Sequence, residues 1–188
     1  MKVVAIAGSI VGSTTKTVME KVIDMFADQY PQHEISLLDL GKFDIQFSDG
    51  RNYVDYEGET KEAAEMIMNA DALIIGTPIF QSSIPGTLKN VFDLLPVDAF
   101  RDKTVSTVVT AGSAKHYLVA EQQLKPILSY MKANLVPTYV FVEEQDVFQK
   151  EIINDDIPFR IERLLQDTVM MTDSFREMRE KIEAQYDF

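Results

Sequence analysis

The chain contains no cysteine among its 188 residues. Disulfide bonds, thiolate zinc sites, cysteine-ligated iron–sulfur clusters and redox-active cysteine pairs are therefore excluded. We expect no metal site. Any redox chemistry would need a borrowed organic cofactor.

Long hydrophobic runs are also lacking. No segment approaches the roughly 20 consecutive apolar residues that a membrane-spanning helix needs. The N-terminus leads directly into a strand pattern, with no basic region or cleavage site before it. We therefore expect a cytoplasmic protein without a membrane partner.

Basic residues are few: 18 Lys and Arg stand against 30 Asp and Glu, which gives a formal net charge of −12. Nucleic acids and anionic membranes are bound by clustered basic residues, so we expect no nucleic-acid partner. A nucleotide site in such a chain needs a local basic contact. The length and the 46% hydrophobic content indicate one globular domain over residues 1–188.

Strand and helix patterns alternate along the chain. Strands are predicted at 3–7, 34–38, 71–78, 103–110 and 136–142. Helices are predicted at 14–29, 59–70, 87–95, 117–133 and, acidic and C-terminal, about 158–185. Pro126 should kink the 117–133 helix or leave it irregular near residue 122. The alternation predicts a doubly wound, five-stranded parallel sheet with helices on both faces, in either the Rossmann or the flavodoxin-like strand order.

The first strand pattern ends in a loop suited to an anion. Gly8 follows the apolar run, Ser9, Ser13, Thr14 and Thr15 supply hydroxyls, and a helical pattern begins directly afterwards. The free N–H groups and positive dipole of a helix N-terminus favour anions. The alternative, that Ser13 or Thr14 only caps the helix, stays open.

The glycine spacing of this loop limits the kinds of anion that it could bind. Gly8 and Gly12 are four residues apart and no Gly-Lys-Ser/Thr follows, so both the Walker loop and the dinucleotide fingerprint are excluded. In the flavodoxin-like order 2-1-3-4-5, the loops 8–16, 78–86 and 110–116 converge on one crevice at the carboxyl ends of the strands. One wall could take a single phosphate, and the other two a flat ring.

The segment GTPIFQSSIPGTLKNVFDLLP at residues 76–96 resembles the NADPH-dependent FMN reductase family of flavodoxin-like proteins. The resemblance runs from residue 2 to about 145. It is nearest to the FMN reductases that supply reduced flavin to monooxygenases. It implies FMN as cofactor, NADPH or NADH as cosubstrate, a possible flavin-dependent monooxygenase partner, and a homodimer or homotetramer.

The resemblance also implies the binding residues. The phosphate would be held by Ser9, Ser13, Thr14, Thr15 and Lys16, and the isoalloxazine ring by Pro78, Ile79, Phe80, Gln81, Thr110, Gly112 and Ser113, with His116 nearby. Val11 stands where the family pattern G-S-x-R-x-x-S often has arginine, which leaves Lys16 and helix N–H groups to compensate.

The implied reaction is hydride transfer from nicotinamide C4 to flavin N5, which needs little side-chain chemistry. No catalytic residue is assigned, and the alternative role for His116 is to cap the following helix or to pack against it. Two other activities stay open on the same residues: reduction of quinones or azo compounds, and flavodoxin-type electron transfer without a nucleotide site. A flavin-free regulatory domain of the receiver type is disfavoured, because Gly8-Ser9 stands where paired acids would be needed.

Overall fold

The computed structural model describes residues 1–185, and its centre is a parallel sheet in the order β2-β1-β3-β4-β5. The strands are β1 Lys2–Ala7, β2 Glu34–Asp39, β3 Ala72–Pro78, β4 Thr104–Ala111, β5 Asn134–Leu135 and β6 Val140–Glu143. Both β5 and β6 pair with β4, at its beginning and its end. The predicted fold class and strand order are confirmed.

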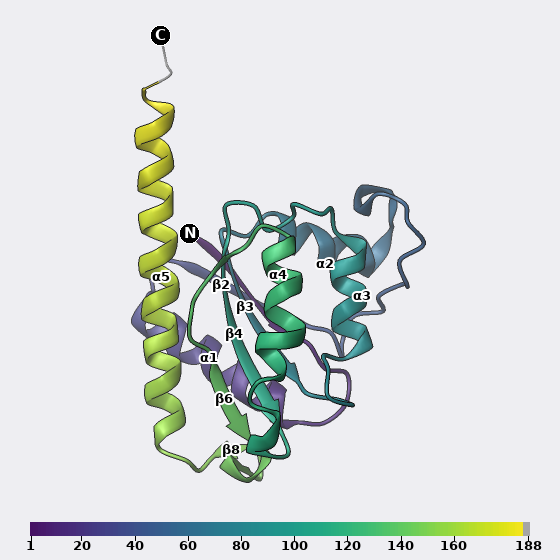
Figure 1. Cartoon of the computed structure of the whole chain (residues 1–188), viewed down its shortest axis with the longest axis vertical. Coiled ribbons are helices and arrows are strands. Elements are labelled where there is room, and N and C mark those ends of the chain that lie inside the picture. The colour runs from purple at the N-terminus through teal and green to yellow at the C-terminus, as the bar shows by residue number, and fades with distance from the viewer. Residues whose placement is uncertain (186–188) are drawn as a thin grey trace.

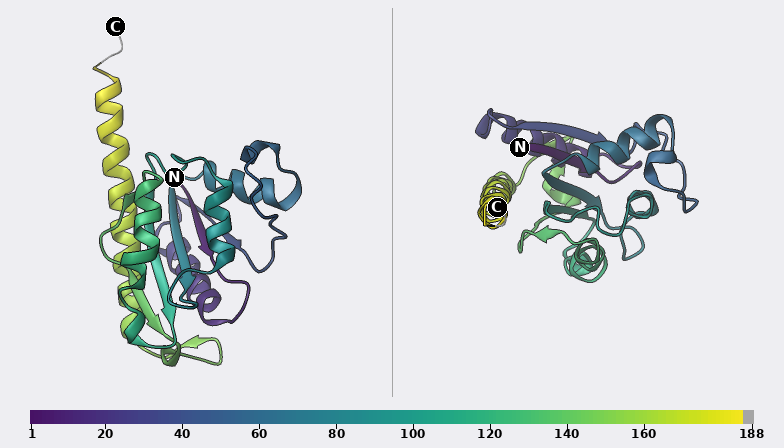
Figure 2. Two further views of the ribbon diagram at one scale, coloured as in Figure 1. Left: turned by 45° about the vertical axis from the view of Figure 1, so that its right-hand side comes forward. Right: turned by 90° about the horizontal axis from the view of Figure 1, so that it is seen from above.

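Helices cover both faces of the sheet (Figures 1 and 2). They are α1 Thr14–Gln29, α2 Gly58–Met68, α3 Gly86–Leu94, α4 Lys125–Tyr130 and α5 Asp156–Glu183. Helices α1 and α5 pack on one face, and α2, α3 and α4 on the other. Short single turns lie at η1 Tyr53–Asp55, η2 Ala114–His116 and η4 Glu144–Asp146, and a hairpin of β7 Val147–Phe148 and β8 Glu151–Ile152 was not predicted.

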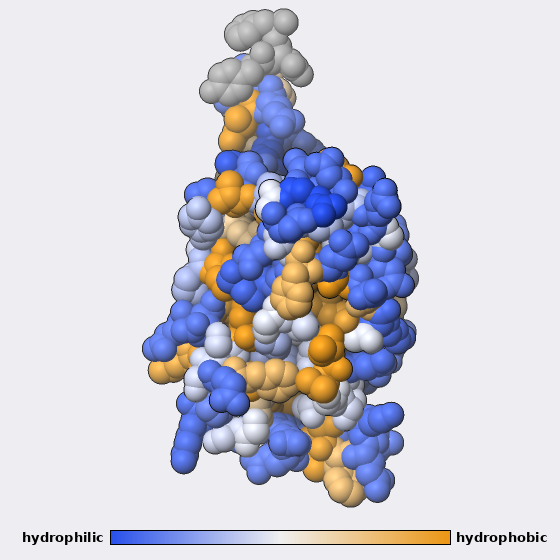
Figure 3. All heavy atoms as spheres, turned by 90° about the vertical axis from the view of Figure 1, so that its right-hand side faces the viewer, coloured by the Kyte–Doolittle hydropathy of each residue, from blue (hydrophilic) through white to orange (hydrophobic). Residues whose placement is uncertain are grey.

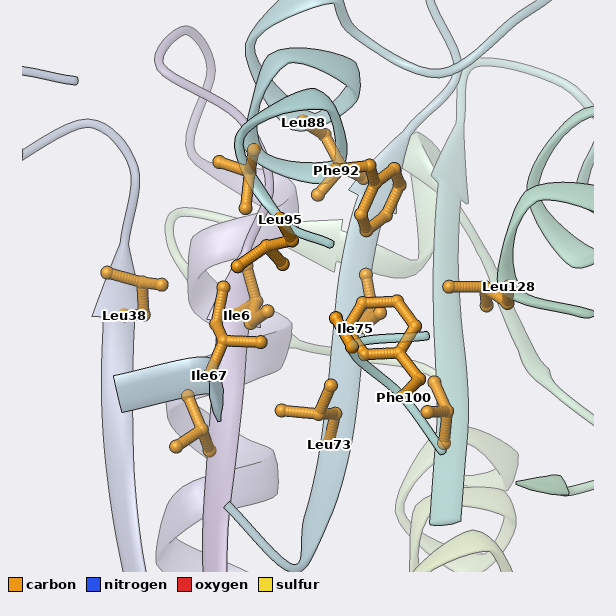
Figure 4. Close-up of a cluster of buried hydrophobic side chains, with 14 of the residues drawn as sticks. Ile6, Leu38, Ile67, Leu73, Ile75, Leu88, Phe92, Leu95, Phe100 and Leu128 are labelled. Carbon is orange, nitrogen blue, oxygen red and sulfur yellow. The ribbon is translucent and has the colours of Figure 1, made fainter. Parts of the chain in front are cut away.

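The two faces of the sheet explain why the strands are apolar throughout. Ile6, Leu73 and Ile75 point to the α2–α4 side, where they meet Leu88, Phe92, Phe100 and other side chains (Figure 4). Ala5, Ile74 and Val108 point to the other side, against α1 and α5. A strand buried on both faces has no solvent side, so apolar and polar residues do not alternate in it. Full burial of one such aliphatic side chain stabilises the fold by about 1.5–3 kcal/mol.

The predicted strand at 136–142 is wrong in its extent. The structure has two short strands instead, β5 before Val136 and β6 from Val140. Between them, Pro137 has no N–H to give to the ladder, and its carbonyl accepts from Lys125 Nζ at 2.7 Å. Val136 still donates its N–H to the carbonyl of Val105, after which the chain leaves β4 and rejoins it at Val140.

The predicted helix at 117–133 is shorter and irregular. A π-helical turn, η3 Ala120–Leu124, precedes α4. The predicted irregularity near residue 122 is confirmed, because Pro126 cannot donate to the carbonyl four residues earlier and the wider turn accommodates this.

The final helix, α5, starts at the carboxyl edge of the sheet and runs past its amino edge (Figure 1). Its inward residues Ile157, Ile161, Leu164 and Leu165 are buried, and Thr172 is the last buried position of the helix. Within residues 1–185, no helix is both long enough and apolar enough to cross a bilayer.

Candidate functional site

A cavity of about 340 Å³ opens at the carboxyl ends of β1, β3 and β4. Each of the three predicted loops contributes to it, together with the turn after β6. Its lining residues are Val11, Gly12, Thr14, Thr15, Pro78, Ile79, Phe80, Thr110, Ala111, Gly112 and Glu144. One part of the wall is apolar and the other presents hydroxyls beside the start of α1, so the cavity has two chemically different ends.

The apolar part is built by a tight turn after β3. Phe80 and Ser83 exchange two backbone hydrogen bonds, of 2.9 and 3.0 Å, around Gln81 and Ser82. Both of these central residues are left-handed, with φ of 49° and 59°, a combination typical of a type I′ turn. Such a conformation costs roughly 1 kcal/mol or more per non-glycine residue, and it is found where surrounding structure enforces it, often at functional sites.

The same turn is anchored to the neighbouring strand. Ile79 donates its N–H to the carbonyl of Thr110 at 2.9 Å. Beyond β4, Ala114 donates its N–H to Glu143 Oε2 at 3.0 Å, which ties the loop after β4 to the end of β6. The wall formed by residues 78–80 and 110–112 is therefore fixed before any ligand arrives.

Thr15 and Thr110 join the two ends of the cavity. Their hydroxyls lie 2.6 Å apart and both side chains are buried. Thr15 sits in the first turn of α1 and Thr110 near the end of β4. This hydrogen bond fixes the helix N-terminus against the sheet, and it engages the Thr15 hydroxyl that was predicted to face a phosphate.

Lys16, the basic residue of the predicted phosphate loop, does not line the cavity. Its Nζ lies 2.9 Å from Oδ2 of Asp39, a residue that is only 5% exposed. The Asp39 carboxylate raises the pKa of Lys16 above its ordinary value. A buried carboxylate without a partner would be costly, so Asp39 holds Lys16 in place.

The other predicted residues divide into two groups. Thr14, Thr15, Pro78, Ile79, Phe80, Thr110 and Gly112 line the cavity, whereas Ser9, Ser13, Lys16, Gln81, Ser113 and His116 lie around it. Ser9 Oγ donates to the carbonyl of Val11, and Ser113 Oγ accepts from the N–H of Lys115, so these hydroxyls shape their own loops. His116 ends the short η2 turn. Residues of both groups stay candidates for flavin contacts.

Four lining residues were missed by the sequence prediction: Val11, Gly12, Ala111 and Glu144. Val11 had been noted only as a departure from the family pattern. Glu144 follows the strand that pairs with the end of β4, so the strand order itself could have placed it at this edge. It is the one ionisable side chain among the described lining residues.

Aromatic side chains pack around the end of β4. The Tyr139 hydroxyl donates to the carbonyl of Tyr117, and the two rings stack with centroids 5.1 Å apart. Burial raises the pKa of Tyr139 well above its ordinary value. Tyr139 therefore stays a neutral hydrogen-bond donor, and it packs with Ile79 against Val109 and Phe141.

A parallel sheet in this order, with a cavity where the strand order reverses, defines a flavodoxin-like nucleotide-binding domain. The structure named "Crystal structures of NADH:FMN oxidoreductase (EMOB) - apo form" matches with a TM-score of 0.70 and 28% identity, over 94% of this chain and 89% of that one.

The chain is similar to known flavin reductases over most of its length. The model of the NADPH-dependent FMN reductase family matches residues 1–147. The NAD(P)H-dependent FAD/FMN reductase of Geobacillus thermodenitrificans (strain NG80-2) is 38% identical over 172 residues, which cover 91% of this chain and 93% of the relative. The NADH-dependent FMN reductase SfnF of Pseudomonas fluorescens (strain Pf0-1) is 29% identical over 86% of each chain.

The chain belongs to the NADPH-dependent FMN reductase family. The predictions of an oxidoreductase, of FMN as the flavin and of NAD(P)H as the electron donor are confirmed at this level.

Proposed function

We propose that the cavity binds FMN with its ring against residues 78–80 and 110–112 and its ribityl phosphate toward the start of α1. The observation that carries the proposal is that the fixed apolar wall shares the cavity with Thr14 and the start of α1. Ile79 and Phe80 suit the ring, and the first N–H groups of α1 have no intrahelical acceptors, which suits the phosphate. When bound, FMN supplies hydride acceptance at N5 and onward electron transfer.

The protein's own residues would position the flavin and polarise its ring. Ile79 and Phe80 have their N–H groups engaged within the fold. Gln81 and Ser82, at the tip of the turn, keep N–H groups that the turn itself does not use, and these would stabilise negative charge on the reduced ring. Phe80 is 41% exposed, so the nucleotide could approach over it.

The charge variant Thr14→Glu tests the placement of the phosphate. A carboxylate at this position would repel the phosphate and should weaken FMN binding at least tenfold, measured by quenching of flavin fluorescence. Ser174→Glu adds the same charge on the exposed part of α5 and should leave FMN affinity unchanged. Undiminished FMN affinity in Thr14→Glu would refute the placement.

The physiological electron acceptor and the preferred nucleotide are a separate question. We propose transfer of reduced flavin to a flavin-dependent monooxygenase, on the resemblance of residues 76–96 and the sequence that follows. Steady-state rates with NADPH and NADH, each with free FMN and with a quinone, test this. Faster turnover with the quinone than with FMN would favour the alternative of a quinone reductase.

We also propose a homodimer or homotetramer in the cytoplasm. A hydrophobic groove between α3 and α4 supports assembly, since it is lined by Phe92, Leu95 and Ile127 and flanked by the exposed side chains of Val97 and Tyr130. Light scattering on the purified chain measures the mass, and Tyr130→Glu should reduce it if this groove is the interface. Cell fractionation tests the compartment.

A further inference from the structure

The charges at the cavity are opposite to those expected for a phosphate site. Among the described lining residues there is no lysine or arginine, and the ionisable one is Glu144. Val11, where the family pattern often has arginine, is a 61% exposed valine on the cavity wall. Lys16 is engaged by the buried Asp39 at 2.9 Å. The dianionic end of FMN therefore meets a helix N-terminus and hydroxyls without a cation.

The Glu144 carboxylate lies close to the wall proposed to hold the ring. It begins η4 directly after β6, and a Cβ placed on Gly112 would be 3.7 Å from its Oε2. Charges about 10 Å apart at a protein surface still interact at moderate ionic strength. The field of Glu144 therefore extends through the cavity, and the chain's net charge of −12 adds to it.

Resting on the proposed function, we propose that this site selects flavins by the ring and ribityl chain and not by the phosphate, and that Glu144 is the specificity-determining residue against phosphorylated flavins. A neutral flavin, riboflavin, then binds at least as tightly as FMN. The dipole of the helix N-terminus favours an anion only by roughly two- to fivefold, and Glu144 together with the net charge of −12 more than offsets this attraction.

The salt dependence of FMN binding distinguishes this site from one in which cations hold the phosphate. Where cations hold a phosphate, added salt screens the attraction and weakens FMN binding. At this site the salt screens a net repulsion, so FMN binding tightens from low to moderate ionic strength. Riboflavin binding has no such charge to screen and stays constant.

The experiment is a fluorescence titration of riboflavin and FMN into the whole chain at low and at moderate salt, with Glu144→Gln and, as matched control, Glu180→Gln. Glu180 is exposed and lies near the C-terminal end of α5. We expect Glu144→Gln to tighten FMN binding three- to tenfold and to leave riboflavin within twofold. Glu180→Gln should change neither affinity.

Different outcomes of the titration would refute the proposed flavin selectivity and the proposed function. If FMN binds tenfold or more tightly than riboflavin and weakens with salt, the inference is overturned while the proposed function stands. An unchanged FMN affinity in Glu144→Gln also overturns it. If neither flavin binds, the proposed function fails and the inference fails with it.

Discussion

Two of the loops that border the cavity are built differently. The loop after β3, residues 79–83, is a two-residue turn closed by reciprocal hydrogen bonds and tied to β4 through Ile79. The loop after β1, residues 8–13, is held near its tip by the local contacts between Ser9 and Val11, and Ile10 and Val11 are 58% and 61% exposed. The loop after β3 is thus tied to the neighbouring strand, whereas the tip of the loop after β1 is held by contacts within the loop itself.

The surface around these loops is mixed. The face that carries α3 and the 39–58 segment shows apolar residues among hydrophilic ones (Figure 3). In the β3 loop, apolar side chains are partly withdrawn: Ile79 packs against the cluster of Val109 and Phe141. In the β1 loop they face solvent. A ligand that covers Ile10 and Val11 would remove their apolar surface from water. This burial favours binding and does not require one particular conformation of the loop.

The largest expected effect concerns the base of the β1 loop, where it contacts β3. A Cβ on Gly8 would lie 2.8 Å from the carbonyl oxygen of Gly76, and Gly8 donates its N–H to that same oxygen. Gly8→Ala must therefore push the ends of β1 and β3 apart. We expect it to lower the free energy of unfolding by about 3 kcal/mol, measured by urea denaturation.

Gly86→Ala is the control for this substitution. A Cβ there has no heavy atom within 4 Å, so its effect should stay within about 0.5 kcal/mol. Equal stability of the two variants would show that the close contact between Gly8 and β3 relaxes without cost.

The second prediction concerns the Thr15–Thr110 hydrogen bond, which ties the start of α1 to β4. Thr15→Val leaves the buried Thr110 hydroxyl without its partner, and it should cost about 2 kcal/mol in the free energy of unfolding. The double variant Thr15→Val/Thr110→Val removes both polar groups and should cost less than the sum of the single variants. A strictly additive double-mutant cycle would contradict the coupling.

The fold was predictable because its signals are redundant. The apolar runs of β1, β3 and β4, each followed by a helical period, require a covered parallel sheet whatever the details. The break between β5 and β6 was missed because Pro137 interrupts hydrogen bonds to a strand far away in sequence. The β7–β8 hairpin was missed because strands of two residues have no measurable period.

The site was predictable only to the level of its loops. The ends of three strands located the cavity, and Thr14, Ile79 and Thr110 lie in its wall. The ion pair that engages Lys16 could not be read locally, since Asp39 comes 23 positions later and is brought close by the β1–β2 pairing. The same applies to Glu144, which reaches the cavity through the pairing of β6 with β4.

The third prediction concerns a substitution that introduces a cation into the β1 loop. Val11→Arg should tighten FMN binding about tenfold, or about 1.4 kcal/mol, because a guanidinium on the cavity wall can pair with the phosphate. Riboflavin, which has no phosphate, should bind with unchanged affinity in the same titration. Val11→Gln is the uncharged control of similar size, and an equal gain with it would assign the effect to packing.

The smallest effect compares the backbones of the two loops directly. Gly12 has φ of +82° with open space around its Cβ position, so Gly12→Ala should cost only the left-handed strain, about 1 kcal/mol of unfolding free energy. Ser82 already bears such strain, with φ of 59°, so Ser82→Gly should gain about 0.5 kcal/mol, whereas Ser82→Ala should change little. If the rigid turn depends on its two left-handed residues, Ser82→Gly will keep flavin affinity while stability rises. A loss of affinity at higher stability would mean that the Ser82 side chain, and not the turn, serves the ring.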